Sequence, residues 1–185
     1  ITLMPIPETE VQAMIEDASH RDYAVLVCGR DVVALHNHKP IFDKIFVQGL
    51  GVTNIDITRP VEPLLNQPVL QLTPFFTEDY EKDIFPSMPH CVSARWHPSF
   101  IDITVQGADK GNALKQMTKH LGISLEECIA FGDGGNDMTI LQTAGIGVAM
   151  GNAYEGVKAV ADYVTTSVDE DGIRNAFIHF GIINN

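Results

Sequence analysis

The chain has 185 residues, 45% of them hydrophobic, and a formal net charge of −12, which is enough chain for one good core or two small ones. The acidic balance argues against nucleic acid and anionic membranes as partners, because both attract Lys and Arg. It does not argue against a small phosphorylated substrate, since a bound divalent cation supplies positive charge locally.

Cysteine content and hydropathy narrow the class of protein further. Cys28, Cys91 and Cys128 are odd in number and form no CxxC pair, so we expect reduced thiols rather than a redox or metal role. No apolar stretch approaches the ~18 residues that span a bilayer, and no secretory signal is recognisable. These features predict a soluble, cytoplasmic protein.

The first part of the chain is typical of an α+β module with two hairpins. The expected elements are, in order, a helix with Val11, Met14, Ile15 and Ala18 on one face, a hairpin of strands 23–28 and 31–35 that turns at Gly29-Arg30, a helix with Phe42, Ile45 and Phe46 on one face, a helical turn near Leu64, a strand at 69–73, a helix capped by Thr77, and a hairpin of strands 91–96 and 100–105.

From Asp109 onward, strands and helices alternate, as in a parallel sheet. The expected elements are a helix marked by Leu114, Met117 and Leu121 that ends near Gly122, a strand at 127–131, a helix that begins at Met138, a strand at 146–150, a helix around 157–161, a strand at 163–165, and a last helix through Ile173 and Phe177. The fold class is therefore α/β, and the change of pattern predicts two domains, at residues 1–107 and 108–185. The chain opens in the middle of a strand-like run, Ile1-Thr2-Leu3-Met4, so we expect it to be a fragment.

The most informative segment is Gly132-Asp133-Gly134-Gly135-Asn136-Asp137, between a buried strand and a helix. Open α/β sheets bind their ligands at the carboxyl ends of the strands, where these side chains are expected to lie. The glycines allow a sharp turn and a close approach of an anion or metal. Two acids and an amide suit a hard cation such as Mg²⁺.

Together with the following run from Ala144 to Ala153, this segment resembles the fourth motif of the haloacid dehalogenase superfamily, and within it the Cof-type sugar-phosphate phosphatases. The resemblance implies a partial Rossmannoid core at residues 108–185 and an α+β cap domain of the C2 type at residues 1–107. It also implies a Mg²⁺-dependent phosphatase that hydrolyses small phosphorylated metabolites, sugar phosphates in particular.

The resemblance assigns roles to three residues of the motif. Asp133 would ligate Mg²⁺, although it also suits an N-cap of the following helix. Asn136 would contact the phosphoryl group or substrate, the alternative being an ordinary turn residue. Asp137 would orient its neighbours from outside the ligand set rather than bind the metal directly.

Lys110 resembles the lysine of the family's third motif. A fixed ammonium group stabilises the charge that spreads over the phosphoryl oxygens in the transition state. Its expected place at a helix start, where backbone N–H groups favour anions, supports this role over that of a solvated surface charge. Asp109 is expected to cap the same helix.

Other polar residues carry weaker signals. His36 and His38 are interpreted as exposed loop histidines rather than metal ligands. For Arg95, Trp96 and His97 two interpretations stay open, contact with a sugar or a structural place in the cap. Asp102 is expected to be a solvated strand residue.

Two elements of the family pattern are missing. Phosphatases of this superfamily use an Asp nucleophile in a DxDGT-like motif, and its nearest counterpart, Asp169-Glu170-Asp171-Gly172, has Ile173 in place of Thr and is expected to open a helix. The Ser/Thr motif cannot be identified either. We therefore expect the chain to start downstream of the nucleophile and to be inactive alone.

The absent nucleophile strand has a structural consequence as well. The strand at 127–131 would be left with an open apolar edge, which is a template for association. Self-association through this edge is therefore an expected alternative to covering by the missing segment.

Two other functions remain as hypotheses. One is a non-catalytic module or inactive fragment that binds phosphorylated sugars through Lys110 and Asn136. The other is the phosphorylation domain of a P-type ion pump, which the hairpin-rich segment before Lys110 and the lack of transmembrane helices disfavour.

Overall fold

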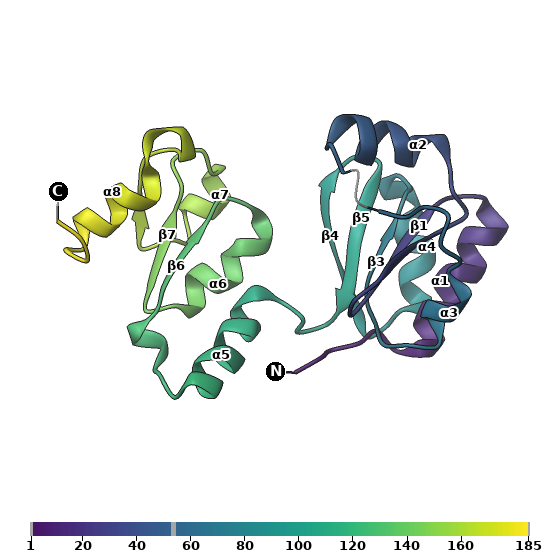
Figure 1. Ribbon diagram of the computed structural model, residues 1–185, viewed down its shortest axis with the longest axis horizontal. Coiled ribbons are helices and arrows are strands. Elements are labelled where there is room, and N and C mark those ends of the chain that lie inside the picture. Colours follow the sequence, from purple (N-terminus) through teal and green to yellow (C-terminus); the bar gives the residue numbers. More distant parts are fainter. Residues whose placement is uncertain (1, 53–54, 185) are drawn as a thin grey trace. The chain divides into compact units, whose positions relative to one another are not determined.

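The computed structural model describes residues 2–52 and 55–184, except for the side chain of Trp96. The chain divides into two compact units, one of Leu3–Gln106 and the other of Ile1–Thr2 with Gly107–Asn185. We call them the N-terminal unit and the C-terminal unit and describe each by itself (Figure 1).

The N-terminal unit is built on an antiparallel sheet of five strands in the order β2-β1-β3-β5-β4. The strands are β1 Val25–Gly29, β2 Val33–His36, β3 Val69–Pro74, β4 Cys91–His97 and β5 Phe100–Val105. The helical elements are α1 Glu8–Arg21, α2 Pro40–Phe42 with the π-helix Asp43–Gly49, α3 Glu62–Leu65, and α4 Glu81–Ile84 between the 3₁₀ turns Glu78–Tyr80 and Phe85–Ser87.

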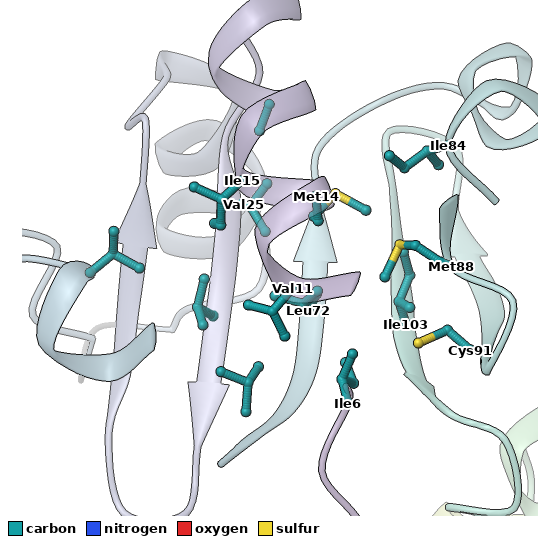
Figure 2. Close-up of a cluster of buried hydrophobic side chains, with 14 of the residues drawn as sticks. Ile6, Val11, Met14, Ile15, Val25, Leu72, Ile84, Met88, Cys91 and Ile103 are labelled. Carbon is teal, nitrogen blue, oxygen red and sulfur yellow. The ribbon is translucent and has the colours of Figure 1, made fainter. Parts of the chain in front are cut away.

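One face of this sheet is covered by α1, whose apolar residues recur at helical spacing and so face the strands together. Figure 2 shows Val11, Met14 and Ile15 of α1 beside Val25 and Leu72 of the sheet, and all five are buried. The predicted first helix and its apolar face are confirmed.

The other face carries an aromatic cluster that includes Phe42, Phe46, Phe75 and Phe100. The rings of Phe42 and Phe46 stack at 5.1 Å, and Phe75 meets both edge-on. The predicted single helix around Phe42 is instead a short α-turn that continues as a π-helix. The extra residue per turn still leaves Phe42 and Phe46 buried in the same cluster.

The C-terminal unit holds a parallel sheet of three strands in the order β6-β7-β8. The strands are β6 Ile129–Gly132, β7 Ile146–Ala149 and β8 Tyr163–Val164. The helices are α5 Lys110–Leu121, α6 Met138–Thr143, α7 Glu155–Lys158 and α8 Gly172–His179, with 3₁₀ turns at Leu125–Glu127, Gly135–Asp137 and Val168–Glu170.

Helices pack against this sheet through small and aromatic residues. Ala130 of β6 and Ala149 of β7 share a buried cluster with Leu141 of α6, while Phe131 meets Phe177 of α8 edge-on at 5.3 Å. The predicted α/β class is confirmed. No helix in the described part of the chain has the length and hydropathy needed to cross a bilayer.

The predicted helix that ends near Gly122 is confirmed as α5, although Met117 and Leu121 are 42% and 59% exposed, because α5 packs on α6 through Gly111. Two local predictions were wrong. The side chain of Thr77 makes no capping hydrogen bond. Asp102 is not simply solvated, since Thr73 Oγ1 on the neighbouring strand donates to its Oδ1 at 2.7 Å.

The edge of β6 bears on the association hypothesis. Within residues 2–52 and 55–184, β6 pairs with β7 on one side and with no strand on the other. Ile129 and Phe131 on this strand are half-buried. Self-association along this edge stays a prediction.

Candidate functional site

The candidate site begins where β6 ends. Asp133 follows Gly132 at the carboxyl edge of the parallel sheet. It is exposed rather than turned into the core. A Cβ atom at Gly132 would collide with the side chain of Asp137. Glycine at position 132 therefore lets the following loop fold back so that the Asp137 side chain packs against residue 132 and accepts from the Asp133 backbone N–H.

Asp137 connects the parts of the site. Its Oδ2 accepts hydrogen bonds of 3.0 Å from the backbone N–H groups of Asp133 and Gly134, and its Oδ1 accepts one from Lys110 Nζ. The residue is only 7% exposed. Burial alone would raise the pKa of Asp137, but the hydrogen bonds from Lys110 and the two backbone amides outweigh burial and hold this pKa below its ordinary value. The carboxylate is therefore ionised and held in place by three donors.

Lys110 is the first residue of α5, and local sequence fixes it there. Asp109 caps the helix by accepting from the Asn112 backbone N–H at 2.9 Å, which confirms its predicted N-cap role. Thr139 Oγ1 of α6 accepts from the Gly111 backbone N–H at 3.2 Å. The Lys110 side chain is 50% exposed, so its ammonium group contacts Asp137 and still faces solvent.

Asn136 lies in the 3₁₀ turn that precedes α6 and is exposed. Its side chain makes no hydrogen bond within the described part of the chain. An amide with a free donor and a free acceptor can bind a ligand at either atom. The structure thus brings Lys110, Asp133 and Asp137 into one connected network and leaves Asn136 on the same loop.

One residue of this network was missed in the sequence analysis. Asn152, in the loop after β7, donates from Nδ2 to Asp133 Oδ2 at 3.1 Å, and its Oδ1 accepts from the Val168 backbone N–H at 3.0 Å. The available signal was topological, because loops that follow neighbouring parallel strands meet at one edge of the sheet. Asn152 is the first side chain with an amide after β7.

The carboxylate oxygen that the site offers suits Mg²⁺, as one part of the coordination shell of the ion. Mg²⁺ keeps several waters and commonly binds one or two carboxylates plus substrate phosphates. Asp133 offers such a carboxylate at an exposed position, whereas Asp137 is engaged by three donors. No cluster of three or more His, Cys, Asp or Glu side chains able to hold a metal is present among the described residues.

Several polar residues considered in the sequence analysis have other roles in the N-terminal unit. Arg95 donates to Glu81 Oε1 at 2.6 Å and to the carbonyls of the β4–β5 turn, including His97 and Phe100. This set of bonds supports the structural interpretation of Arg95. His97 stacks on Phe100 at 4.9 Å and lines a hollow of about 460 Å³ with Ile41. The side chain of Trp96 lies outside the described residues.

The two loop histidines also differ from expectation in part. His36 ends β2 rather than lying in a loop, and its Nε2 lies 2.9 Å from Ser19 Oγ. Burial lowers the pKa of His36, and the charge of Glu62 opposes it to a lesser extent. His38 is an exposed loop residue, as expected, and its Nε2 lies 2.8 Å from Asp43 Oδ2.

Comparison with known proteins identifies the family of this chain. Residues 1–177 match the model of the haloacid dehalogenase-like hydrolases. The chain belongs to that family. Its relative in Bacillus subtilis (strain 168), named "Putative phosphatase YkrA", is 30% identical over 184 residues, which cover 97% of this chain and 68% of the relative.

Two further relatives of this haloacid dehalogenase-like chain have informative names. The solved structure of the HAD subclass IIB sugar phosphatase BT4131 has a TM-score of 0.85 and 43% sequence identity, covering 97% of this chain and 69% of that chain. The 5-amino-6-(5-phospho-D-ribitylamino)uracil phosphatase YcsE of Bacillus subtilis (strain 168) is 42% identical over 83 residues, which are 45% of this chain and 33% of that protein. The resemblance recognised from the motif is confirmed.

Proposed function

We propose that this chain is part of a Mg²⁺-dependent phosphatase that hydrolyses small phosphorylated metabolites, sugar phosphates in particular. The observation that carries the proposal is the contact of Lys110 with Asp137, whose other oxygen accepts from the backbone of Asp133 and Gly134. This network fixes an ammonium group and an exposed carboxylate on one loop system. Relatives named as phosphatases agree with the proposal.

Lys110 acts on the transferring phosphoryl group. Its half-exposed ammonium group donates to Asp137 and keeps further N–H donors for phosphate oxygens. Charge spreads over these oxygens in the transition state, and a donor already held in position needs no reorganisation at that moment. Asn136 offers an amide donor to the same ligand, and Asp137 positions Lys110 without contacting the substrate.

Asp133 would hold the metal. When bound, Mg²⁺ supplies positive charge that neutralises phosphate oxygens in a chain whose net charge is −12. Asp137 orders the backbone on which Asp133 lies, because both the Asp133 and Gly134 amides donate to it. Substituting Asp133 would therefore remove a metal ligand, whereas substituting Asp137 would disorder the backbone on which Asp133 lies.

The covalent step uses an Asp nucleophile outside these 185 residues. A carboxylate oxygen of that Asp attacks phosphorus, the bond from phosphorus to the ester oxygen breaks, and the alcohol leaves with a proton. Water then hydrolyses the aspartyl phosphate, which restores the carboxylate and releases inorganic phosphate. The N-terminal unit is the cap in this proposal, and the 185-residue chain alone is expected to show no turnover.

The experiment that tests the function measures hydrolysis of p-nitrophenyl phosphate and of a panel of sugar phosphates by the complete gene product. Asp133→Ala is expected to abolish the Mg²⁺-dependent rate, because the metal loses its carboxylate. Lys110→Met is expected to lower kcat about 10²- to 10³-fold, as the loss of a preorganised transition-state donor does.

Matched substitutions in the same unit serve as controls. Asp169→Ala and Lys115→Met remove exposed groups of the same charge that lie outside the network, and both variants should keep wild-type turnover. Unchanged turnover in Asp133→Ala would contradict the metal role. Binding of sugar phosphates by the wild-type protein without any turnover would favour a non-catalytic module instead.

A further inference from the structure

We infer, on the basis of the function proposed above, that Asn152 is a positioning residue that gives the site its preference for Mg²⁺ over Ca²⁺. The starting observation is that the amide of Asn152 is held between two partners from different loops. Its Oδ1 accepts from the Val168 backbone N–H at 3.0 Å, and its Nδ2 donates to Asp133 Oδ2 at 3.1 Å.

The contact with Val168 fixes which end of the amide faces Asp133. A backbone N–H can only donate, so the Asn152 carbonyl oxygen must face Val168 and the NH₂ group must face the carboxylate. The loop that carries Val168 is itself held close to the Asn152 loop, because Gly151 N donates to Thr166 O at 3.0 Å. The donor aimed at Asp133 is therefore preorganised by the fold and not by the metal.

This donor occupies one oxygen of Asp133 and leaves the other open. Oδ2 accepts from Asn152, whereas Oδ1 accepts no hydrogen bond from residues 2–52 and 55–184. A carboxylate with one oxygen occupied is disposed to bind a cation through the remaining oxygen alone. Asn152 thus opposes chelation by both oxygens of Asp133.

The two common divalent cations respond differently to that constraint. Mg²⁺ demands near-octahedral coordination with few protein ligands, while Ca²⁺ takes about 6–8 oxygen ligands in flexible geometry and often binds a carboxylate through both oxygens. Holding Asp133 to one free oxygen lowers the affinity for Ca²⁺ relative to Mg²⁺. Releasing Oδ2 should therefore favour Ca²⁺.

Binding of each metal, rather than activity, provides the test. The dissociation constants of Mg²⁺ and Ca²⁺ are measured separately on the complete gene product by following backbone amide shifts of the Asp133 loop in two-dimensional NMR titrations. In Asn152→Ala, the ratio of Ca²⁺ to Mg²⁺ dissociation constants is expected to fall about tenfold, the lower end of the effect of removing a partner of a metal ligand.

A second variant at the same position keeps the test independent of loop disorder. Asn152→Asp retains an oxygen for the Val168 N–H but removes the donor to Asp133, and its added carboxylate also favours a larger coordination shell. This variant should shift the ratio in the same direction. The control is Asn175→Ala, because Asn175 donates to Thr166 and Glu170 on the Val168 loop and has no contact with Asp133, so the ratio should stay at the wild-type value.

The outcomes separate this inference from the function on which it rests. An unchanged ratio in both Asn152 variants, with Mg²⁺ still bound through Asp133, overturns the role of Asn152 and leaves the phosphatase proposal intact. An equal change in Asn175→Ala also overturns it, because the effect would then come from loop order. If the wild-type protein binds Mg²⁺ no better than Asp133→Ala does, the metal site itself is refuted.

Discussion

Asp137 is a single buried acid that connects the parts of the candidate site. Three donors converge on its two oxygens, two from the backbone of its own loop and one from the ammonium group of Lys110. Hydrogen bonds to a charged acceptor are stronger than neutral ones, and removing such an acceptor leaves its donors unpaired. The position of Lys110 therefore depends on residue 137 as much as on α5.

Two thiols of the N-terminal unit, those of buried Cys91 and half-buried Cys28, give a separate prediction at the scale of the residue. Burial and a smaller effect of Asp102 raise the pKa of Cys28 to about 11, and burial together with Glu10 raises the pKa of Cys91 to about 12, both from an ordinary value of 9.0. Above pH 9.0 the unfolded chain loses these protons first, so it binds fewer protons than the native state and the free energy of unfolding falls as pH rises.

Urea denaturation at a series of alkaline pH values measures this effect. The free energy of unfolding should decline by at most about 1.4 kcal/mol per pH unit for each thiol. The double variant Cys28→Ala/Cys91→Ala should give a shallower decline, although Tyr23, whose pKa burial also raises, keeps part of it. An equally steep decline in the double variant would show that these thiols do not titrate as described.

At the scale of the element, the packing of α5 on α6 is set by Gly111. A Cβ atom at this position would lie 2.6 Å from the backbone oxygen of Thr139 and 2.7 Å from Thr143 Oγ1. Both distances are shorter than side chains tolerate, so only glycine allows this approach of the two helices. The close contact also holds the first turn of α5, and with it Lys110, near Asp137.

Gly111→Ala should therefore destabilise the protein despite the better helix propensity of alanine. Overpacking costs about 1–3 kcal/mol, which exceeds the roughly 1 kcal/mol gained in propensity. Thermal denaturation followed by circular dichroism gives the difference in stability. Gln116→Ala on the exposed side of α5 should be neutral or slightly stabilising. A wild-type melting temperature for Gly111→Ala would mean that the two helices can separate freely.

The elements also show what the sequence can and cannot predict. Apolar strand runs separated by turn signals located both hairpins, and the 3.6-residue spacing of Val11, Met14 and Ile15 located α1 and its buried face. Spacing also located α5, but it could not show that Met117 and Leu121 are exposed, because spacing marks a face without saying what covers it. The role of Gly111 in helix packing is invisible in the pattern of α5 alone.

The candidate site, too, could be predicted from the sequence only in part. The loop from Gly132 to Asp137 could be located from sequence because its glycines and acids are adjacent in the chain. The contacts of Asp133 with Asn152 and of Lys110 with Asp137 join positions 19 and 27 residues apart, and local patterns contain no information about such pairs. Parallel strand order, once known, brings these loops to one edge of the sheet.

At the scale of the whole molecule, the chain is made of two units with separate cores. The N-terminal unit, Leu3–Gln106, buries apolar side chains on both faces of its own sheet. The candidate site residues all belong to the other unit. A unit with a complete core of its own meets the usual condition for independent folding.

We therefore expect a fragment of residues 3–106 to fold alone. Its amide NMR spectrum should be well dispersed and should overlay the corresponding signals of the 185-residue chain, apart from residues near the new terminus. Urea should unfold it in one cooperative transition. A collapsed or unfolded spectrum would show that the fragment needs the rest of the chain to fold.

The glycine contacts have a consequence for reading mutational data on this protein. Gly132 and Gly111 contact no ligand in the proposed mechanism, yet a side chain at Gly132 would collide with Asp137, and one at Gly111 would collide with Thr139 and Thr143 of α6. A deep mutational scan of the complete gene product scored by phosphatase activity would therefore rank these two positions beside Asp133 and Lys110. A parallel readout of protein abundance is needed to separate them, because the glycine variants should lose abundance whereas Asp133→Ala should accumulate normally.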